Sequence, residues 1–450
     1  MTPRLESFGR IFTAATRVLG PDAAIAILRG GAAAPDSLLG YGNGRSYGDS
    51  CLNAPGTLVD MRSMNRILSF DPHTGVLEAE AGTLLCDIIA HAAPFGYFPP
   101  VVPGTQFVTL GGAIANDVHG KNHHRRGTFG RHVEALNLLR SDGTEYRCAP
   151  DQNALFYEAT IGGLGLTGLI LTASIRLMRI DSLDVEERVT PFGGLAEFFD
   201  HAAAADAENE YVVAWIDQLA SGKRAGRGLL MAGNHARHGS RSADTSSARF
   251  GVSFQPPVSL LGTPFLKLFN LAYRNRKAAA RAARAVPYRG FFFPLDGVRD
   301  WNRLYGPSGL YQHQSVVPEA QARTAIAALL ECTHRAGQGS FLTVLKRFGA
   351  GRSPGIMSFP RAGFTLTLDF PNKGASTLAL LAELDRITID AGGAVNPYKD
   401  ARMSAETFAA SFPDWRLVEA VRDPAFASDF WRRTAGRLTA SMGALPAAAE

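Results

Sequence analysis

Residues 40–47, which include three alternating glycines followed by an arginine, a serine and a tyrosine, constrain this chain more than any other segment. Glycine lacks a Cβ atom and reaches positive φ without penalty, so such a backbone can turn tightly and approach a ligand closely. Successive N–H groups in a turn of this kind form a concave anion site that suits a pyrophosphate. Taken alone, however, the segment is better explained as an ordinary glycine-rich surface turn.

Two further glycine-rich segments, residues 102–115 and 161–168, favour ligand binding over a surface turn. Three such loops in one region suggest a large, extended, polyanionic ligand that the backbone contacts at several points. In the third loop, Gly163, Gly165 and Gly168 have the spacing of a dinucleotide fingerprint, which requires a helix directly after it. Residues 169–177 are instead β-branched and partly alternating, which predicts a strand and argues against a Rossmann site. No Gly-Lys-Ser/Thr closes the first loop, so it is not a nucleotidase phosphate loop either.

Motifs along nearly the whole chain carry a family resemblance. The most specific is His-Gly-Lys-Asn-His-His at residues 119–124. The others lie at residues 44–49, 103–105, 111–115, 301–303, 305–307, 340–342, 399–400 and 405–408. In this order and spacing they resemble the vanillyl-alcohol-oxidase superfamily of flavoenzymes, with its PCMH-type FAD-binding domain, and most narrowly its oxidases of lipid-linked ribose. The resemblance implies an α+β fold of two domains, an FAD-binding domain and a cap domain with an antiparallel sheet and helices.

The pattern of elements divides the 450 residues into three parts. We expect an FAD-binding domain at residues 1–182 and a substrate-binding cap domain at residues 183–395. By resemblance, the helical residues 396–450 return to the FAD-binding domain. The predicted elements include strands at 56–61, 76–81, 169–177, 211–216 and 364–370 and helices at 84–93, 317–337 and 376–392.

Composition limits where the protein works and what it binds. Its four cysteines, at positions 51, 86, 148 and 332, are few and widely spaced, which is typical of reduced thiols in the cytoplasm. No run of eighteen apolar residues exists, and arginines interrupt every apolar stretch near the N-terminus, so we expect neither a membrane span nor a secretory signal. The net charge of +5 is too modest to indicate nucleic-acid binding. We therefore expect a cytoplasmic protein.

Two segments of the expected cap domain stand out. Residues 219–249 are rich in glycine, serine and arginine, which predicts a mobile loop. Residues 264–290 contain seven cations and no acidic residue: Lys267, Arg274, Arg276, Lys277, Arg281, Arg284 and Arg289. A helix here would place Phe265, Leu268, Phe269 and Ala272 on one face. Such a helix can lie on the anionic inner face of the plasma membrane, but a solvated helix that caps the domain explains the pattern equally well.

The resemblance implies that the glycine-rich loops bind FAD. The implied cofactor-binding residues are Gly40, Tyr41, Gly42, Asn43, Gly44, Arg45, Ser46, Tyr47, Gly48, Asp49, Gly104, Thr109, Leu110, Gly111, Gly112, Asn116, Asp117, Val118, His119 and Ile170. Arg45 stands where many relatives have a histidine that bonds covalently to the flavin. A guanidinium stays protonated and cannot attack, and residues 111–130 lack the cysteine of the bicovalent subtype. We therefore expect non-covalent FAD, with Arg45 as a donor to its pyrophosphate.

Three residues are expected at the catalytic centre. By pattern alone Lys399 is a surface lysine, but by resemblance it is an active-site lysine beside the isoalloxazine, where an ammonium would stabilise negative charge. The resemblance also places His119 at the catalytic face and Tyr47 in a supporting role. His123 and His124 are expected to be structural, and the spacing of the three histidines lacks the pattern of a metal site.

The cap is expected to supply the substrate-binding residues. These are Gln312, Gln314, Lys346, Trp215, Thr365 and Thr367. Amide groups suit sugar hydroxyls and a lysine suits a phosphate, although each of these residues could equally serve the fold alone. Two positions depart from the mycobacterial members, which have cysteine at the position of Thr367 and a flavin-contacting tyrosine at that of Asn396.

The resemblance implies an FAD-dependent oxidation of a secondary sugar hydroxyl to a ketone. The implied substrate is a polyprenyl-phosphoryl ribose, oxidised at its 2′-hydroxyl. A separate NAD-dependent short-chain reductase would then complete an epimerisation to arabinose for cell-wall synthesis. One alternative is an alditol or sugar-lactone oxidase with a soluble substrate. The other is a flavin-binding protein without catalysis, which would have no need of Lys399 or His119.

Overall fold

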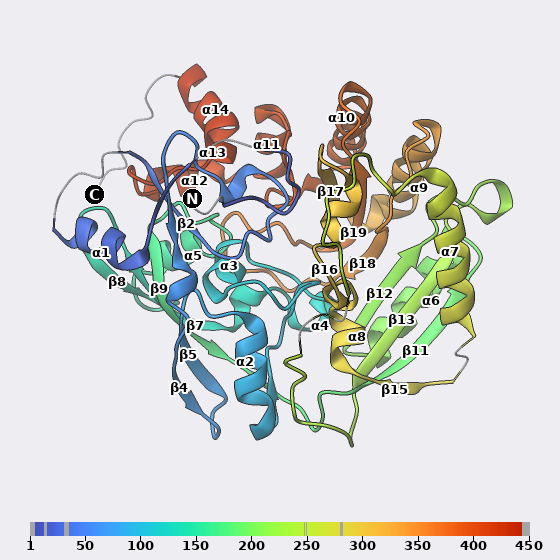
Figure 1. The fold of residues 1–450 in the computed structure, drawn as a ribbon, viewed down its shortest axis with the longest axis horizontal. Coiled ribbons are helices and arrows are strands. Elements are labelled where there is room, and N and C mark those ends of the chain that lie inside the picture. The colour runs from blue at the N-terminus through green and yellow to red at the C-terminus, as the bar shows by residue number, and fades with distance from the viewer. Residues whose placement is uncertain are drawn as a thin grey trace.

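The structure, a computed structural model, describes residues 5–12, 16–30, 36–246, 248, 250–279 and 282–442. It confirms the α+β class, because two separate sheets lie side by side with helices packed against each (Figure 1). None of the helices in this described part of the chain combines the length and the apolar character needed to cross a bilayer.

The first sheet contains five strands in the order β4-β5-β9-β7-β8. They are β4 (Ile67–Asp71), β5 (Val76–Glu80), β7 (Val133–Leu139), β8 (Glu145–Cys148) and β9 (Leu169–Arg176). A parallel sheet of β1 (Arg17–Leu19), β3 (Thr57–Asp60) and β2 (Leu38–Tyr41) lies beside it, and β6 (Tyr97–Phe98) pairs with β10 (Met178–Arg179). The helices of this part are α1 (Pro21–Arg29), α2 (Leu85–Ala92), α3 (Leu110–Ala115), α4 (His123–Arg126) and α5 (Ala154–Thr160). Alternate residues of β5, Leu77 and Ala79, are fully buried against α2 and α3, as the period of a strand requires.

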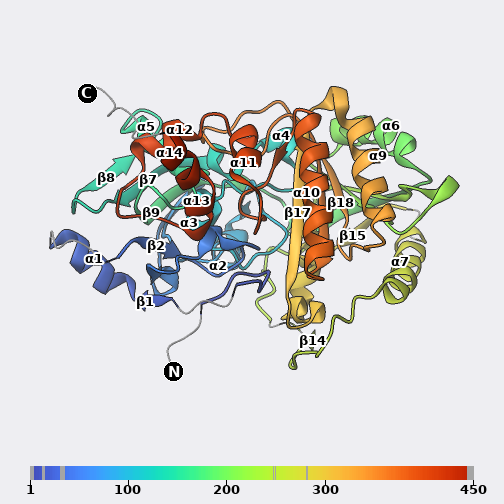
Figure 2. The same ribbon diagram turned by 90° about the horizontal axis from the view of Figure 1, so that it is seen from above.

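The second sheet contains eight strands in the order β15-β11-β13-β12-β18-β19-β17-β20. They are β11 (Val185–Phe192), β12 (Tyr211–Ile216), β13 (Gly228–His235), β15 (Arg284–Val286), β17 (Leu310–Val317), β18 (Val344–Phe348), β19 (Gly363–Pro371) and β20 (Ala394–Val395). The helices α6 (Leu195–Glu208), α9 (Glu319–Arg335) and α10 (Ala375–Asp390) pack on one face through a shared apolar core. Helix α7 (Thr263–Ala278) contacts the opposite face through Tyr273, and Figure 2 shows it apart from α6 and α9. The short elements α8 (Tyr288–Phe292), β14 (Phe250–Gly251) and β16 (Val298–Arg299) complete this part.

Antiparallel register places functional residues of four strands in one row. Gln314 of β17 pairs with Thr367 of β19, Thr367 pairs with Val344 of β18, and Val344 pairs with Trp215 of β12. Directly paired residues share a face of the sheet. This row therefore lies on the face opposite the apolar core that α6, α9 and α10 cover.

The structure corrects two expectations for the cap. Residues 219–249 are not simply a mobile loop, because they contain β13, which pairs along its length with both β11 and β12. Residues 264–290 are not one helix: α7 ends at Ala278, and β15 and α8 follow. Position 281 lies outside the described residues.

The C-terminal helices pack against the first part of the molecule. They are α11 (Ala405–Ser411), α12 (Trp415–Val421), α13 (Asp429–Arg433) and α14 (Ala435–Met442). Leu38 of β2 bridges to Phe426, and Figure 1 shows α12 and α13 beside β2. The chain thus leaves the cap sheet after β20 and crosses between the two parts at residues 396–404, the segment that contains Lys399.

Candidate active site

A cavity of about 710 Å³ lies between the glycine-rich loops and the polar row of the cap sheet. This volume is typical of a ligand or cofactor site. Of the residues expected at the site, those that line the cavity are Gly40, Tyr41, Gly42, Asn43, Gly44, Arg45, Ser46, Tyr47, Gly104, Thr109, Gly111, Gly112, Asn116, Val118, His119, Ile170, Trp215, Gln312, Gln314, Lys346, Thr367 and Lys399. One cavity therefore brings together residues from both parts of the chain.

Hydrogen bonds to three other segments hold the first glycine-rich loop in place. Asn43 Nδ2 donates to the carbonyl of Phe107 at 2.8 Å, and the Tyr47 N–H donates to the carbonyl of Tyr398 at 3.1 Å. At Gly44 φ is +61°, and a Cβ there would lie 2.2 Å from the Tyr41 hydroxyl. Only glycine satisfies both constraints at this turn.

The surroundings of Arg45 fit an anionic ligand. Its guanidinium lies 5.6 Å from the ring centre of Phe8 and 5.7 Å from that of Phe107. Its Nε is buried and has no hydrogen-bond partner among the described residues, which is costly for a charged donor unless a ligand supplies the acceptor. At Gly104, on the same cavity wall, a Cβ would meet nothing within 4 Å. A half-buried cation whose Nε has no partner, beside open backbone, fits the pyrophosphate of FAD.

Lys399 is half-buried at the junction of the two parts of the molecule. Its Nζ lies 4.2 Å from the ring centre of Tyr47. Burial lowers the pKa of Lys399 to about 8, and the negative charge of Asp369 partly opposes this shift. Asp369 accepts a hydrogen bond from Gln312 Nε2 at 2.5 Å, and burial raises the pKa of its carboxyl to about 7. A lysine with this pKa is largely an ammonium at neutral pH.

His119 lies between two of the cap residues. Gln314 Nε2 is 2.9 Å from His119 Nε2, and Lys346 Nζ is 3.2 Å from His119 Nδ1. Burial, together with the charge of Lys346, holds the pKa of His119 well below its usual value, so the imidazole is neutral. Burial and the charges of Lys121 and Lys399 also lower the pKa of Lys346 to about 7.

Five residues expected at the site do not line the cavity. Gly48 packs against the backbone of Asp400, and Leu110 is fully buried in the core of the first part. The buried carboxylate of Asp117 accepts bonds from the Gly130 N–H and from two serine hydroxyls. The fourth, Thr365, lies behind Gln314 and accepts a hydrogen bond from it at 3.0 Å. These residues support the site from behind instead of forming its surface.

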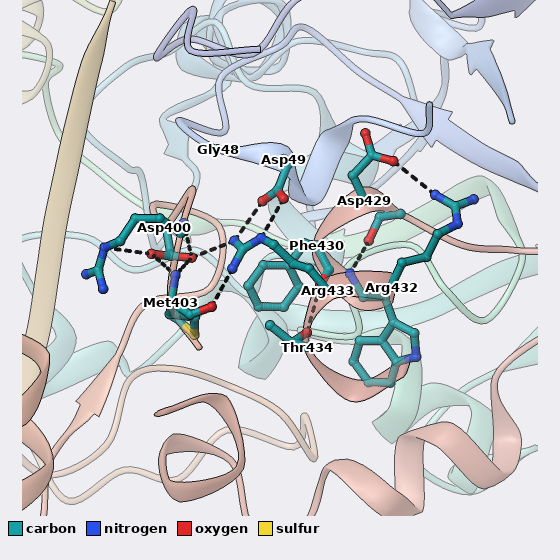
Figure 3. A network of polar contacts seen from close by, with 12 residues as sticks. Gly48, Asp49, Asp400, Met403, Asp429, Phe430, Arg432, Arg433 and Thr434 are labelled. Atoms are coloured by element: carbon teal, nitrogen blue, oxygen red, sulfur yellow. Dashed lines mark hydrogen bonds and ion pairs between the residues drawn. The ribbon is translucent and has the colours of Figure 1, made fainter. Parts of the chain in front are cut away.

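The fifth residue, Asp49, binds Arg433 of α13 instead of a ligand (Figure 3). The same guanidinium donates to Asp400 at 2.6 Å. Asp400 directly follows Lys399 in the sequence and is only 3 % exposed. The role of Asp49 is therefore to fix, through Arg433, the loop that carries the lysine.

His123 and His124 have structural partners, as expected. The Gly349 N–H donates to His123 Nδ1 at 3.2 Å, and the ring of His123 lies 4.4 Å from that of Phe348. His124 Nε2 lies 3.0 Å from the carbonyl of Asn209.

Sequence analysis missed several residues of the cavity wall. Leu164, Gly165 and Gly168 of the third loop line the cavity, although only Ile170 was expected there. Gly165 and Gly168 both have positive φ, which explains why glycine occurs at these positions. The glycine spacing of the loop could therefore have identified them as part of the cavity wall. Lys121 and Tyr273 also line the cavity, and the motif at residues 119–124 contains the first of them.

Comparisons with known proteins agree with this geometry. Residues 20–149 match the protein family described as "FAD binding domain". Decaprenylphosphoryl-β-D-ribose oxidase of Mycolicibacterium smegmatis is 34 % identical over 96 % of this chain and 97 % of its own. An uncharacterised Streptomyces coelicolor protein from the mprA 5′ region is 33 % identical over 76 % of this chain and 96 % of its own. L-Gulonolactone oxidase of Mus musculus is 32 % identical over about 30 % of either chain. The chain thus has an FAD-binding domain and belongs to the family of FAD-dependent oxidoreductases that includes decaprenylphosphoryl-β-D-ribose oxidase.

Proposed function

We propose that this enzyme oxidises the 2′-hydroxyl of a polyprenyl-phosphoryl ribose to a ketone, with non-covalently bound FAD. The observation that carries the proposal is the cavity in which Lys399 and His119 face Gln312, Gln314 and Thr367 of the cap sheet. Amides and hydroxyls on a rigid sheet suit a sugar with several hydroxyl groups. Similarity over nearly the full length of a decaprenylphosphoryl-ribose oxidase supports the same substrate class.

The residues that would hold the cofactor are those of the glycine-rich loops, with Arg45 as the cation for its pyrophosphate. Bound FAD supplies an acceptor for the hydride that leaves the sugar carbon. Lys399 contributes a positive charge beside Tyr47, and such a charge stabilises electron density that accumulates nearby during the reaction. Gln312 and Gln314 orient the sugar. No histidine lies at position 45, which supports a non-covalent cofactor.

The apolar end of the cavity supports a lipid-linked substrate. Trp215, Met231 and Tyr273 line it, and Tyr273 belongs to α7. The outer side of α7 exposes Phe265, Leu268 and Leu271. Apolar residues on the cavity wall and the exposed apolar side of the adjoining helix suit a prenyl chain that stays in a bilayer. The similarity to L-gulonolactone oxidase, by contrast, covers only about 30 % of the chain.

Membrane contact is therefore part of the proposal, through a surface that shares Phe265 and Leu268 with the one expected. Lys277 binds Glu187 at 2.9 Å, Arg284 lies 3.4 Å from the same carboxylate, and Phe269 packs inward against Phe341. Lys267 and Arg276 of α7 remain exposed. Seven large apolar residues between positions 250 and 271 are exposed as well: Phe250, Phe254, Val258, Leu260, Phe265, Leu268 and Leu271. We propose that this set, here called the apolar patch, inserts into the inner face of the plasma membrane. A separate NAD-dependent short-chain reductase would then reduce the ketone to arabinose for cell-wall synthesis.

Product trapping tests the proposed reaction. Farnesyl-phosphoryl ribose is incubated with the FAD-loaded enzyme and an artificial electron acceptor, and the mixture is then reduced with borodeuteride. A 2′-ketone yields ribose and arabinose that both carry deuterium at C2, which mass spectrometry of the released sugars detects. Deuterium at another carbon, or none, would contradict the proposal.

A further inference from the structure

Asn396 is a buried residue at the crossing between the cap sheet and the C-terminal helices, and its side chain begins a hydrogen-bonded chain that ends at Lys346. The N–H of Tyr398 donates to Asn396 Oδ1 at 3.1 Å. A backbone N–H can only donate, so the atom it meets must be the amide oxygen. The amide nitrogen Nδ2 therefore faces Gln314, 2.8 Å from Oε1. The backbone thus sets the orientation of the Asn396 amide.

The same reasoning fixes Gln314. Because Asn396 presents its NH₂ group, the facing atom of Gln314 must be an acceptor, the oxygen Oε1. The NH₂ group of Gln314 then faces two atoms, Thr365 Oγ1 at 3.0 Å and His119 Nε2 at 2.9 Å. Gln314 is 2 % exposed and Asn396 is fully buried, so water does not compete for these bonds. The backbone N–H of Tyr398 therefore determines, through Asn396 and Gln314, that an NH₂ group faces His119.

This orientation selects one tautomer of His119. Since Gln314 donates to Nε2, that nitrogen must carry the lone pair, and the single proton of a neutral imidazole sits on Nδ1. Nδ1–H lies 3.2 Å from Lys346 Nζ. An ammonium has three donors and no acceptor, so only an uncharged amine can accept this bond. A cationic Lys346 and the observed contact are incompatible.

We propose that Asn396 is a positioning residue that, through Gln314 and His119, keeps Lys346 as a free amine, and that this amine is the catalytic base. In this step, which rests on the proposed function, the hydrogen bond from His119 Nδ1–H to Lys346 breaks and frees the lone pair of the amine. The 2′-hydroxyl proton moves to this lone pair while the C2 hydride passes to the bound flavin. The alcohol loses two electrons and the flavin gains them. The proton then leaves Lys346 to solvent before the next turnover.

The charged groups around Lys346 agree with this assignment. Lys121 and Lys399 disfavour its charged form, and burial is the largest cause that lowers the pKa of the neighbouring His119 and His123. No carboxylate contributes to the lowered pKa of about 7. A general base performs best when its pKa lies near the working pH. An uncharged amine is also a weak partner for a phosphate, so the phosphate-binding role expected for Lys346 is replaced by this one.

Nitrogen NMR of the resting FAD-loaded enzyme tests the chain of bonds without any turnover. The protein is labelled with ¹⁵N-histidine, and the signals of the two His119 ring nitrogens are assigned by their loss in His119→Asn. The chemical shifts of these two nitrogens report the tautomer. We expect the proton on Nδ1. A proton on Nε2 in the wild type overturns the proposal, whether or not any variant folds.

The nearly isosteric Asn396→Asp should exchange donors and acceptors along the whole series of hydrogen bonds from residue 396 to Lys346. A carboxylate can only accept, so Gln314 must turn its NH₂ group toward position 396 and its oxygen toward His119. We expect the His119 proton to move to Nε2 and Lys346 to become charged. The matched control Thr365→Asp adds the same charge on the other side of Gln314 but still accepts from its NH₂ group, so the tautomer should stay. If His119 has the same tautomer in both variants, the proposed chain of hydrogen bonds from Asn396 to Lys346 is refuted.

Stopped-flow reduction of the flavin tests the base separately. Lys346→Met should slow reduction at saturating farnesyl-phosphoryl ribose by about 100-fold or more and remove the rise of the rate through pH 7. A raised KM with an unchanged limiting rate would show that Lys346 binds phosphate instead. If this substrate does not reduce the flavin of the wild-type enzyme at all, the proposed function is wrong. The NMR test of the His119 tautomer needs no turnover and is independent of that result.

Discussion

The guanidinium of Arg433 lies 2.6 Å from the carboxylate of Asp400, the residue that follows Lys399 (Figure 3). The same group binds Asp49 at 2.6 Å, and both carboxylates are 2 % exposed. One cation of α13 therefore joins the end of the first glycine-rich loop to the lysine loop. This arrangement fixes the position of Lys399 relative to Tyr47.

Arg433→Met should destabilise the protein and displace Lys399. The substitution removes the ion-pair partner of the buried Asp49 and leaves Asp400 with Arg402 alone, and breaking a buried pair costs about 3–5 kcal/mol. Thermal unfolding followed by flavin fluorescence measures the loss. The neighbouring Arg432→Met removes a more exposed cation, bound to Asp429, and is the matched control. Equal effects of the two substitutions would mean that Arg433 has no special role.

Lys399→Ala should keep its FAD and lose most of its activity. A lost charge at a reaction site typically slows the reaction about 100- to 1000-fold. In the wild type the reaction needs the ammonium, so its rate should fall as pH rises through the Lys399 pKa of about 8. Stopped-flow flavin reduction measures both effects, with the exposed Lys373→Ala as the control. A near-normal rate in Lys399→Ala would disprove its assigned role, and a colourless protein would make it a cofactor-binding residue.

The purified protein should be yellow, and acid precipitation should release its FAD intact. The reason is Arg45, whose guanidinium cannot form the covalent bond that a histidine forms at this position. Fluorescence of the precipitated polypeptide after washing is the measurement. Flavin that stays with the denatured chain would contradict this prediction.

How much of this could be predicted from sequence depends on the range of the interactions. The glycine-rich loops, the strand after the third loop and the alternating strands of the cap follow from local patterns, and the structure shows them. β13 was hidden because its apolar run lies between glycine- and arginine-rich segments that dominate the local composition.

Local sequence patterns could not predict the long-range polar pairs. Asp49 and Arg433 are 384 positions apart, so nothing local distinguishes a ligand-binding Asp49 from one that binds an arginine. The inner face of α7 is set by polar contacts as well, because Asn270 donates to Asp217 and Lys277 binds Glu187. The side of α7 that packs on the sheet therefore could not be read from apolar periodicity, whereas Phe265 and Leu268 of the expected apolar face are exposed.

Substitutions in the apolar patch should weaken binding to anionic vesicles. Phe254 is 61 % exposed and Leu268 is 68 % exposed, and full burial of such a side chain contributes about 1.5–3 kcal/mol. Phe254→Ser combined with Leu268→Ser should reduce sedimentation with phosphatidylglycerol vesicles by about tenfold or more. Leu417→Ser, at a position 54 % exposed on α12, is the control. Unchanged binding of the double variant would show that the patch does not contact lipid.

The most direct test of the account is anaerobic bleaching of the bound flavin by two kinds of substrate. The absorbance of the FAD-loaded wild type is followed after mixing with farnesyl-phosphoryl ribose or, separately, with free alditols and sugar lactones. The account predicts rapid bleaching by the lipid-linked ribose and bleaching by the soluble compounds that is slower by about 100-fold or more. Equal or faster bleaching by an alditol or a lactone would contradict it and would identify a soluble-sugar oxidase.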